Sequence, residues 1–533
     1  MISRFLFILL FSLAYRLLFS QNVEVTASKP YRAINALKNL YFYYNDQVIS
    51  VKIGDKAIVI QKFDKQGNFK QQREYKDLPK TASIERIGEH NGSYYVFYSV
   101  WNSSKKQLDL FYREINFATG VLERESRKIL TVIGKVADNF TLSSSRLLVR
   151  NHFDFQYSKD HSRLLIQYRR ILKQKGDTNN HDVIGFEVFD RYFNQLFHAE
   201  VAMPYTKKMM DNLDYTVDRN GTPYVIAKVY NDETTDRSNS NKELPNYHIE
   251  ILKIGAGQVT AKPIALESRF INSVAIFETS DSFMTGAGLY HNGTDRHDAD
   301  GIFVFKIKKD GETLETFAYD IPSEVINAHV KSSIARKNRK KSEEEEVLSD
   351  MFFDIVRVMN DGSVLLVAEQ YEERAIASAM NGSELLYPYY LYNSILAAKV
   401  STDGSIAWIN KVPKRQAGRR GRGSMSYQYF YQGDKHHFIY LDNPANADLT
   451  EDEVPSPVSN MGAGLLTDYY IDDASGDMKR INVFNSKDVA NMKVTRVSPF
   501  KVIQLSEYEF FIEVNKRKKG NIMLKFRLDP DQN

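Results

Sequence analysis

Short runs of alternating hydrophobic and polar residues dominate the chain and predict β-strands separated by turns. Clear examples are SYYVFYSVW at 93–101, QLDLFYREI at 107–115 and GIFVFKIKK at 301–309. A period of two places successive side chains on opposite faces of a sheet. Between most of these runs the sequence has no helical pattern, which favours an antiparallel meander over a parallel sheet. The pattern therefore predicts an all-β protein.

A tight hairpin turn recurs along the chain. Residues 397–413, AAKVSTDGSIAWINKVP, read as strand, turn and strand, and FDKQGNFKQ at 63–71 repeats the pattern. The dipeptides D-G, T-G and S-G supply the positive φ that such turns need. The residues that mark the turns are Gly67, Gly120, Asn194, Gly257, Gly311, Gly404 and Gly476. The markers are separated by 53, 74, 63, 54, 93 and 72 residues, which indicates a repeated unit with insertions in places.

A four-stranded antiparallel unit of this length matches one blade of a β-propeller, with the recurring turn as its outer hairpin. After the seventh turn come three more strands, PFKVIQL, EYEFFIEVNK and NIMLKFRL. We predict that NVEVTAS at 22–28 completes this last blade beside the final strand, because closure removes free sheet edges. The prediction is a single eight-bladed propeller over residues 21–533. Seven blades is the main alternative, because the first unit, residues 41–64, is compressed. A string of β-sandwich domains, which needs no incomplete last unit, is another.

Three long segments interrupt the repeat, at 322–348, 371–390 and 442–464. The first begins with helix-like apolar spacing and continues with a basic cluster and four Glu, which predicts a solvated helix and a loop. The third carries three prolines. Because loops on a rigid scaffold carry function disproportionately, we expect these insertions to form partner-specific surface.

The N-terminus has the layout of a secretory signal. Arg4 precedes an apolar run, Phe5–Tyr15, and the small residue Ser20 offers a cleavage position. A membrane-spanning helix needs roughly 18 uninterrupted apolar residues, and Arg16 interrupts the run. We therefore predict a signal peptide at 1–20 rather than a membrane anchor.

The composition narrows the class of protein further. The 533 residues include no cysteine, which excludes disulfides, a thiol nucleophile, a cysteine zinc site and lipidation on cysteine. The formal net charge is only +4, so no global charge favours nucleic acid. We expect an exported protein that does not itself span the membrane, located in the periplasm or associated with the outer membrane or cell surface.

The segment HNGTDRHDADG at 291–301 gathers groups that could bind a metal. The candidate ligands are Asp295, His297, Asp298 and Asp300. Carboxylates and imidazoles suit Ca²⁺ or a transition metal, and a metal-dependent hydrolase would require metal at His291 or His297. The segment fails the EF-hand template, because Ile307 falls where the bidentate Glu should be. A polar loop between strands is the favoured interpretation, with Ca²⁺ as the alternative.

Residues 411–422, KVPKRQAGRRGR, carry six positive charges and no negative one. The candidate partner-binding residues are Lys414, Arg415, Arg419, Arg420 and Arg422. A solvated loop is favoured, and binding to an acidic protein or an anionic glycan is the functional interpretation. The tyrosine clusters YPYYLY at 387–392 and SYQYFY at 426–431 are interpreted as strand packing, with a recognition platform as the alternative.

No nucleophile elbow, zinc-protease helix, phosphate loop or dinucleotide fingerprint occurs in the sequence. A carboxylate pair for glycoside hydrolysis is recognised by its spatial separation, so no catalytic residue is assigned. A non-enzymatic role is favoured. The alternative, a glycan-binding or glycan-cleaving propeller, requires a cavity on one ring face with at least two carboxylates and an exposed aromatic side chain.

The signal, the missing cysteine, the D-G hairpins and the abundance of Tyr, Asn and Lys give a further indication. Over its whole length the chain resembles uncharacterised secreted β-propeller proteins of the Bacteroidota. At the level of fold it also resembles the propeller scaffold of the outer-membrane β-barrel assembly machinery, from which it departs by lacking a lipidation cysteine. These resemblances imply a protein-interaction scaffold or accessory subunit of a cell-envelope complex, with an envelope or outer-membrane protein as partner.

Overall fold

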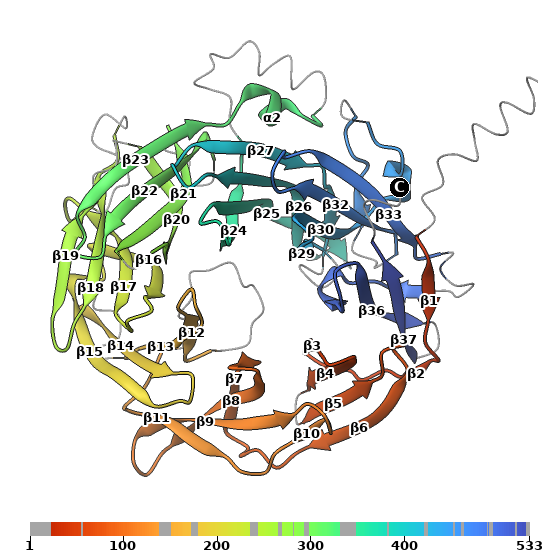
Figure 1. Cartoon of the computed structure of the whole chain (residues 1–533), viewed down its shortest axis with the longest axis horizontal. Coiled ribbons are helices and arrows are strands. Elements are labelled where there is room, and N and C mark those ends of the chain that lie inside the picture. Colours follow the sequence, from red (N-terminus) through yellow and green to blue (C-terminus); the bar gives the residue numbers. More distant parts are fainter. Residues whose placement is uncertain are drawn as a thin grey trace, which may run out of the picture.

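The computed structural model contains eight sheets with antiparallel blade strands, arranged around a central channel as the blades of one β-propeller (Figure 1). It describes residues 23–54, 57–137, 151–171, 180–234, 244–264, 269–280, 282–292, 298–330, 348–380, 383–419, 425–450, 453–459, 463–487, 489, 494–516 and 520–528. The predicted signal peptide lies outside the described residues. Within them, no helix is long and apolar enough to cross a membrane.

Blades 1 to 4 follow one another along the first half of the chain. Blade 1 contains β3 (Lys38–Tyr44), β4 (Gln47–Ile53), β5 (Ile58–Phe63) and β6 (Phe69–Tyr75). Blade 2 contains β7 (Ala82–His90), β8 (Ser93–Asn102), β9 (Gln107–Asn116), β10 (Val121–Leu122) and β11 (Arg127–Ile133). Blade 3 contains β12 (Asp154–Tyr157), β13 (Arg163–Arg169), β14 (His181–Asp190) and β15 (Gln195–Thr206). Blade 4 contains β16 (Met210–Val217), β17 (Pro223–Tyr230), β18 (Tyr247–Ile254) and β19 (Val259–Pro263).

Blades 5 to 8 complete the ring. Blade 5 contains β20 (Phe270–Glu278), β21 (Phe283–His291), β22 (Gly301–Lys308) and β23 (Thr313–Asp320), and the helix α2 (Ser323–Asn327) follows it. Blade 6 contains β24 (Met351–Val358), β25 (Val364–Met380), β26 (Ser383–Val400) and β27 (Ile406–Val412), extended by β28 (Gln416–Gly418) and β31 (Val458–Ser459). Blade 7 contains β29 (Tyr427–Gln432), β30 (Lys435–Asp442), the 3-10 helix η3 (Pro444–Asn446), β32 (Leu465–Asp472) and β33 (Met478–Asn485). Blade 8 contains β34 (Val494–Arg496), the 3-10 helix η5 (Pro499–Lys501), β35 (Val502–Gln504), β36 (Glu509–Lys516), β37 (Gly520–Arg527), β1 (Val25–Ala27) and β2 (Tyr31–Arg32).

Each blade buries both of its faces against its neighbours. Strand β17 is buried at every position, as its nearly continuous apolar sequence requires of a strand covered on both sides. The outer strand β15 instead alternates between buried and exposed positions. In the described residues, eight clusters of buried hydrophobic side chains lie one between each pair of adjacent blades. The core is therefore a ring of eight wedges around the channel.

The recurring hairpin turns pack against the outer part of the preceding blade. Gly404 has φ +91°, and a Cβ atom there would lie 2.4 Å from the ring of Phe317. Gly476 has φ +76°, and its Cβ would lie 2.7 Å from Trp408. At Gly404 and Gly476, glycine is required because the backbone is left-handed and because the preceding blade leaves no room for a side chain.

The N-terminal strand closes the ring, as the sequence predicts. Strand β1 pairs antiparallel with β37, with Val25 opposite Phe526 and Ala27 opposite Leu524. The apparently compressed first unit forms a complete blade, since its first strand begins at Lys38. The prediction of eight four-stranded blades is confirmed, and the seven-bladed and β-sandwich alternatives are wrong.

A buried charge cluster lies beside this closure. Glu513 of β36 accepts hydrogen bonds from Lys52 (2.6 Å) and Tyr31 (2.7 Å), and both Glu513 and Lys52 have side chains with no exposed surface. Lys501 lies 3.1 Å from the other carboxylate oxygen. Burial alone would raise the pKa of Glu513, but Lys501 and Lys52 outweigh it and lower this pKa to about 2. The cluster joins the N-terminal segment, blade 1 and blade 8.

Candidate functional site

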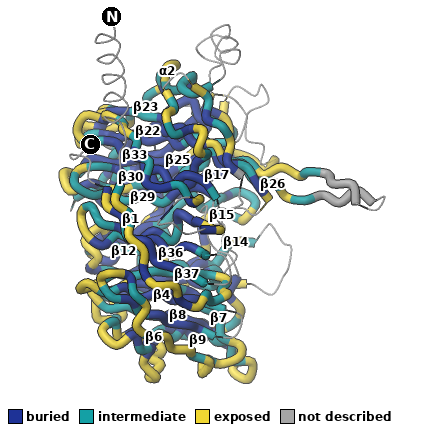
Figure 2. The backbone as a smooth tube through the Cα atoms, turned by 90° about the vertical axis from the view of Figure 1, so that its right-hand side faces the viewer, coloured by how far each residue is buried: buried dark blue, intermediate teal, exposed yellow. Residues whose placement is uncertain are grey.

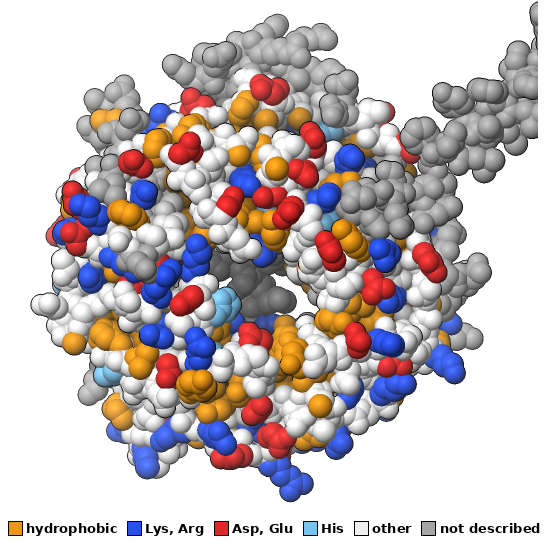
Figure 3. Space-filling model, viewed as in Figure 1, with side chains coloured by type: hydrophobic (Ala, Val, Ile, Leu, Met, Phe, Trp, Pro, Cys, Tyr) orange, Lys and Arg blue, Asp and Glu red, His pale blue; other side chains and the backbone are white. Residues whose placement is uncertain are grey.

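The two faces of the ring differ in the connections that they carry. We call the side with the connections between first and second and between third and fourth strands the turn face, and the opposite side the loop face. Because the strands are antiparallel, the insertions at 322–348, 371–390 and 442–464 all fall on the loop face. Figure 3 views the turn face, where basic and acidic side chains are scattered over the ring. The loop face therefore holds the sequence-specific surface.

A long hairpin projects from the loop face of blade 6. Strands β25 and β26 pair from Val364 opposite Val400 to Met380 opposite Ser383. Strand β24 covers β25 only as far as Gln370, so the hairpin extends about ten residues further, or about 30 Å at the rise of a β-strand. Figure 2 shows it leaving the ring along the propeller axis. We call residues 371–392 the arm.

Two other loop-face segments support the base of the arm. Strand β28 pairs antiparallel with β26, with Tyr390 opposite Gly418 and Tyr392 opposite Gln416. Strand β31 then pairs parallel with β28, with Gln416 opposite Val458. The 371–390 and 442–464 insertions and the basic run at 411–422, which are separate in the sequence, thus form one accessory sheet.

Lys414 lies inside the base of the arm, and its predicted place on an exposed partner-binding surface is corrected. Its ammonium is 2.9 Å from the carboxylate of Glu369, and the two residues are only 1% and 5% exposed. Ser426 Oγ donates a 2.8 Å hydrogen bond to the same carboxylate. Burial lowers the pKa of Lys414, although Glu369 opposes the shift. The local sequence around Lys414 indicates a solvated run because its partner, Glu369, is 45 positions earlier in the chain.

Lys411 connects blade 6 to the helix α2 of the first insertion. Its ammonium donates hydrogen bonds to the carbonyl oxygens of Ile326 (2.7 Å) and Ala328 (2.8 Å), at the end of α2. Burial lowers its pKa to about 8. His329 Nδ1 lies 3.1 Å from the carbonyl oxygen of Glu453, which links the first insertion to the third. The described part of 322–348 contains the expected helix, shortened to five residues, and is tied to the accessory sheet.

The arginines of the basic run have different positions. Arg415 donates to the carbonyl oxygen of Pro455 at 3.4 Å, so it holds the third insertion. Arg419 lies over the ring of Tyr387 on the arm, with 5.4 Å between its guanidinium carbon and the ring centre. Arg420 and Arg422 lie outside the described residues. Of the five predicted partner-binding residues, the structure thus places Arg419 beside the arm's exposed surface.

The two tyrosine clusters have different roles. Tyr387, Tyr389 and Tyr390 are half-buried on the arm and Pro388 is exposed there. Tyr427 instead lies on β29, the inner strand of blade 7, and is buried in the core between blades 6 and 7. Tyr387, Tyr389 and Tyr390 are therefore available for recognition, whereas Tyr392 and Tyr427, which are 1% and 2% exposed, are packed in the interior.

The tyrosines divide between the two faces of the arm. Tyr371, Tyr390 and Tyr392 form one aromatic group, with the rings of Tyr371 and Tyr392 4.9 Å apart. Strand alternation places Tyr387 and Tyr389 on the other face, where Arg374 forms an ion pair with Glu372. The arm therefore offers aromatic rings on both sides, flanked by charge.

The 291–301 segment is a connection on the loop face of blade 5. Asp300 accepts a 2.6 Å hydrogen bond from the backbone N–H of Asn292, and burial raises its pKa. The carbonyl oxygen of Asp298 accepts from Asn272 Nδ2 at 3.3 Å. Asp295 and His297 lie outside the described residues. Among the residues that are described, no cluster of three His, Asp or Glu side chains could hold a metal.

A cavity of about 400 Å³ opens on the channel between blades 7, 8, 1 and 2. Six of its thirteen described lining residues are aromatic, and Glu89 is the one carboxylate among them. This cavity does not provide the carboxylate pair that glycan cleavage requires.

Asp154 and Asp214, on inner strands of blades 3 and 4, have pKa values raised by burial, that of Asp214 to about 7. Asp214 accepts a 2.8 Å hydrogen bond from the N–H of Ile276 in blade 5, which is a blade contact.

Comparisons with known proteins assign no family to the chain. No protein-family profile matches the chain, and no curated protein matches it. Among solved structures it is similar to the WD40 domain of SCAP from fission yeast, with 9% identity, a TM-score of 0.36, and 95% of this chain and 94% of that chain covered. It is similar to the β-propeller domain of the Trilobed protease from Pyrococcus furiosus, with 12% identity, a TM-score of 0.29, and 89% and 98% covered. It is also similar to a Synechocystis apocarotenoid oxygenase mutant, with 9% identity, a TM-score of 0.31, and 71% of this chain and 72% of that chain covered. Such identities carry no activity to this chain.

Proposed function

We propose that the protein is a non-enzymatic interaction module that binds a protein partner through its loop face, with the arm as the main contact. The observation that carries the proposal is the convergence of three loop-face segments on one accessory sheet at the base of the arm. In keeping with its N-terminal sequence, the module is exported and serves as an accessory subunit of a bacterial envelope complex, in the outer membrane or in secretion.

The physical argument concerns the stiffness of the arm. An isolated two-stranded hairpin is marginally stable in water, so a hairpin that extends beyond its blade needs support. Here β28, β31 and the buried Glu369–Lys414 pair supply that support. A rigid projection loses little conformational entropy on binding.

The surface of the arm suits a protein partner. Tyrosine adds a large contact area at low entropic cost and can form hydrogen bonds, which is why recognition surfaces are rich in it. Tyr387, Tyr389 and Tyr390 are all half-buried in the free protein, so a partner can cover them further. The nearby Arg374 and Arg419 add charged contacts at the edge of this surface.

A shortened arm provides the test. Replacing residues 373–390 by Asn-Gly joins Glu372 to Leu391, which already face each other across the hairpin, by a turn that suits two-residue connections. The propeller should stay folded, because residues 364–370 of β25 keep their pairing with β24 and β26. Affinity purification from native membranes in mild detergent, followed by mass spectrometry, should recover a partner with the full chain and not with the shortened one.

The matched control is Tyr192→Ala, which removes a 70% exposed tyrosine from the turn face. This variant should recover the same partner as the unmodified protein. Recovery of identical partners by the shortened-arm variant, or recovery of the full chain only as a free monomer, would count against the proposal.

A further inference from the structure

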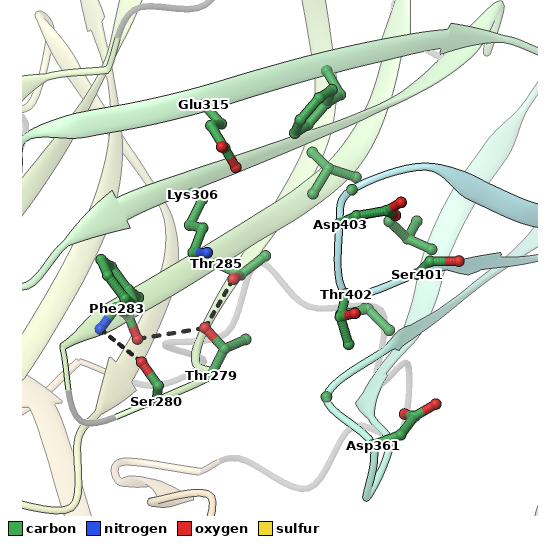
Figure 4. Close-up of a pocket in the computed structure, with 16 residues that line it drawn as sticks. Thr279, Ser280, Phe283, Thr285, Lys306, Glu315, Asp361, Ser401, Thr402 and Asp403 are labelled. Carbon is green, nitrogen blue, oxygen red and sulfur yellow. Dashed lines mark hydrogen bonds between the residues drawn. The ribbon is translucent and has the colours of Figure 1, made fainter.

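A second recessed site lies on the turn face, between blades 5 and 6. Its volume is about 250 Å³ (Figure 4). One wall comes from β21, β22, β23 and the β20–β21 turn of blade 5. The other comes from the β24–β25 and β26–β27 turns of blade 6. We call it the blade 5–6 cleft, and it lies on the opposite side of the ring from the arm.

Lys306 and Glu315 are the charged groups of the blade 5 wall. They are partners in the register of β22 and β23. Lys306 Nζ lies 4.7 Å from the centre of the Phe283 ring and points into the cleft. Within the described part of the chain, neither side chain makes a hydrogen bond or an ion pair. Both charges are therefore available to a ligand.

At two other blade junctions the charged groups are paired. Lys309, between blades 4 and 5, lies 3.2 Å from Asp218 and also pairs with Glu278. Lys399, between blades 6 and 7, lies 2.7 Å from Asp473. In these positions the ion pairs hold neighbouring blades together. The blade 5–6 cleft differs because its lysine and glutamate make no such bond.

Small hydroxyl side chains supply most of the remaining polar surface. They are Thr279, Ser280, Thr285, Ser401 and Thr402. Thr279 Oγ1 and Thr285 Oγ1 lie 3.0 Å apart, which fixes their orientation. Asp361 and Asp403 accept hydrogen bonds from Ser363 and Ser405 within their own turns, and their carboxylates point away from the blade 5 wall in Figure 4. These two carboxylates shape the turns rather than face the ligand.

We propose that the blade 5–6 cleft binds one sugar ring of a glycan. A simple anion would meet Glu315 and a simple cation would meet Lys306, whereas a sugar hydroxyl can accept from the ammonium and donate to the carboxylate. The apolar floor, formed by Val304, Val364 and Val400, suits the C–H face of a sugar. The volume lies below the roughly 300–1,000 Å³ of drug-sized pockets, which limits the occupant to about one ring. The site is independent of the arm.

Saturation-transfer difference NMR tests this with glucose, galactose, mannose and N-acetylglucosamine as probes. At least one sugar should receive saturation from the protein. Lys306→Ala and Glu315→Gln should each weaken its binding about tenfold or more, because each loses a hydrogen bond to a charged group. Lys308→Ala is the matched control, since Lys308 lies two residues along the same strand, pairs with Glu312 and does not line the cleft. It should leave binding unchanged.

Two results would overturn the proposal. One is the absence of a saturation-transfer signal from all four sugars. The other is a signal that Lys306→Ala and Glu315→Gln leave as strong as in the unmodified protein, since the sugar would then bind elsewhere. Thermal unfolding of each variant checks that the propeller is intact. Because Glu315 is exposed, its substitution keeps the test valid even if Lys306→Ala unfolds.

Discussion

At the scale of single residues, the packing between blades depends on glycines at the recurring turns. Gly476→Ala would place a methyl group about 2.7 Å from Trp408 while the backbone stays left-handed. A left-handed Ala costs about 1–2 kcal/mol and overpacking typically adds 1–3 kcal/mol. We therefore expect urea unfolding to show a loss of about 2–5 kcal/mol of unfolding free energy.

The chain contains a control that separates these two costs. Gly257 occupies the matching turn of blade 4 with φ +84°, but no atom lies within 4 Å of its added Cβ. Gly257→Ala should therefore lose only the backbone cost of about 1–2 kcal/mol. Equal losses for Gly257→Ala and Gly476→Ala would show that the turn does not press on the preceding blade.

Buried charges are the residues that sequence patterns place least well. Lys411 and Lys414 belong to a run of positive charge that looks solvated, yet Lys411 is bonded to the end of α2 and Lys414 is buried in the base of the arm. Their partners come from remote segments, so spacing along the chain does not show the pairing. The carboxylates that pair with the buried lysines are easier to recognise from the sequence. Glu369 follows the apolar run Val364–Ala368 and Glu513 follows the apolar run Phe510–Ile512, and carboxylates in such positions are rarely buried unless they are paired.

At the scale of elements, the arm depends on the ion pair at its base. Lys414→Met leaves the carboxylate of Glu369 buried without its cation, which should cost about 3–5 kcal/mol. The double variant Lys414→Met with Glu369→Leu replaces the whole pair by apolar groups, which is often neutral. We expect urea unfolding to show a large loss for the single variant and recovery of most of it in the double variant.

An additive result would contradict this account of the arm's base. If the double variant lost as much stability as the two single variants together, Glu369 and Lys414 would not act as a pair. Glu369→Leu alone completes the cycle and measures their coupling.

The arm itself could not be recognised from the sequence. YPYYLY and SYQYFY share the same alternation of aromatic residues, because both are strands. Their difference lies in what covers them. Tyr427 packs between two blades, whereas Tyr387 and Tyr389 lie beyond the edge that β24 covers. Burial of this kind is set by strand length and by pairing with remote segments, which a local pattern does not contain.

At the scale of the whole molecule, the Glu513 cluster makes closure sensitive to acid. The pKa of Glu513 falls from its ordinary 4.5 to about 2 in the fold. A lowered carboxyl pKa contributes stability that is fully present above pH 4.5 and is lost as the pH falls toward 2. Glu513→Gln should therefore unfold more easily than the unmodified protein at pH 7, by about 3–5 kcal/mol, and this difference should shrink between pH 4.5 and pH 2.

Thermal or urea unfolding at pH 7 and at pH 3 measures this difference. A gap that stays constant with pH would show that the charge of Glu513 does not stabilise the junction. The neutral residue Gln61, also fully buried in blade 1, gives a control in Gln61→Leu, whose effect should not change over this pH range.

The ring could be predicted from the sequence because its repeat is written locally. Each blade contains its own alternating strands and its own turn, so the length of the repeat and the number of strands can be read from the local sequence without knowledge of tertiary contacts. The placement of all insertions on one face then follows from antiparallel order. The accessory sheet and the blade 5–6 cleft could not be predicted, because each joins segments that meet only after the ring has formed.

Every surface described above requires a ring that is closed between β1 and β37. The absence of cysteine allows a direct test, because two introduced cysteines can form only one intramolecular disulfide. Thr26 and Lys525 are opposite each other in the strand register, at a separation that cross-strand disulfides can bridge. Thr26→Cys with Arg191→Cys, on blade 3, is the control pair.

The measurement is non-reducing gel electrophoresis of both double variants after mild oxidation. With a closed ring, Thr26→Cys/Lys525→Cys should migrate as a faster monomeric band that dithiothreitol abolishes, and the control pair should not. Failure of the first pair to form this band, or equal cross-linking in both pairs, would contradict a propeller closed by its N-terminal strand.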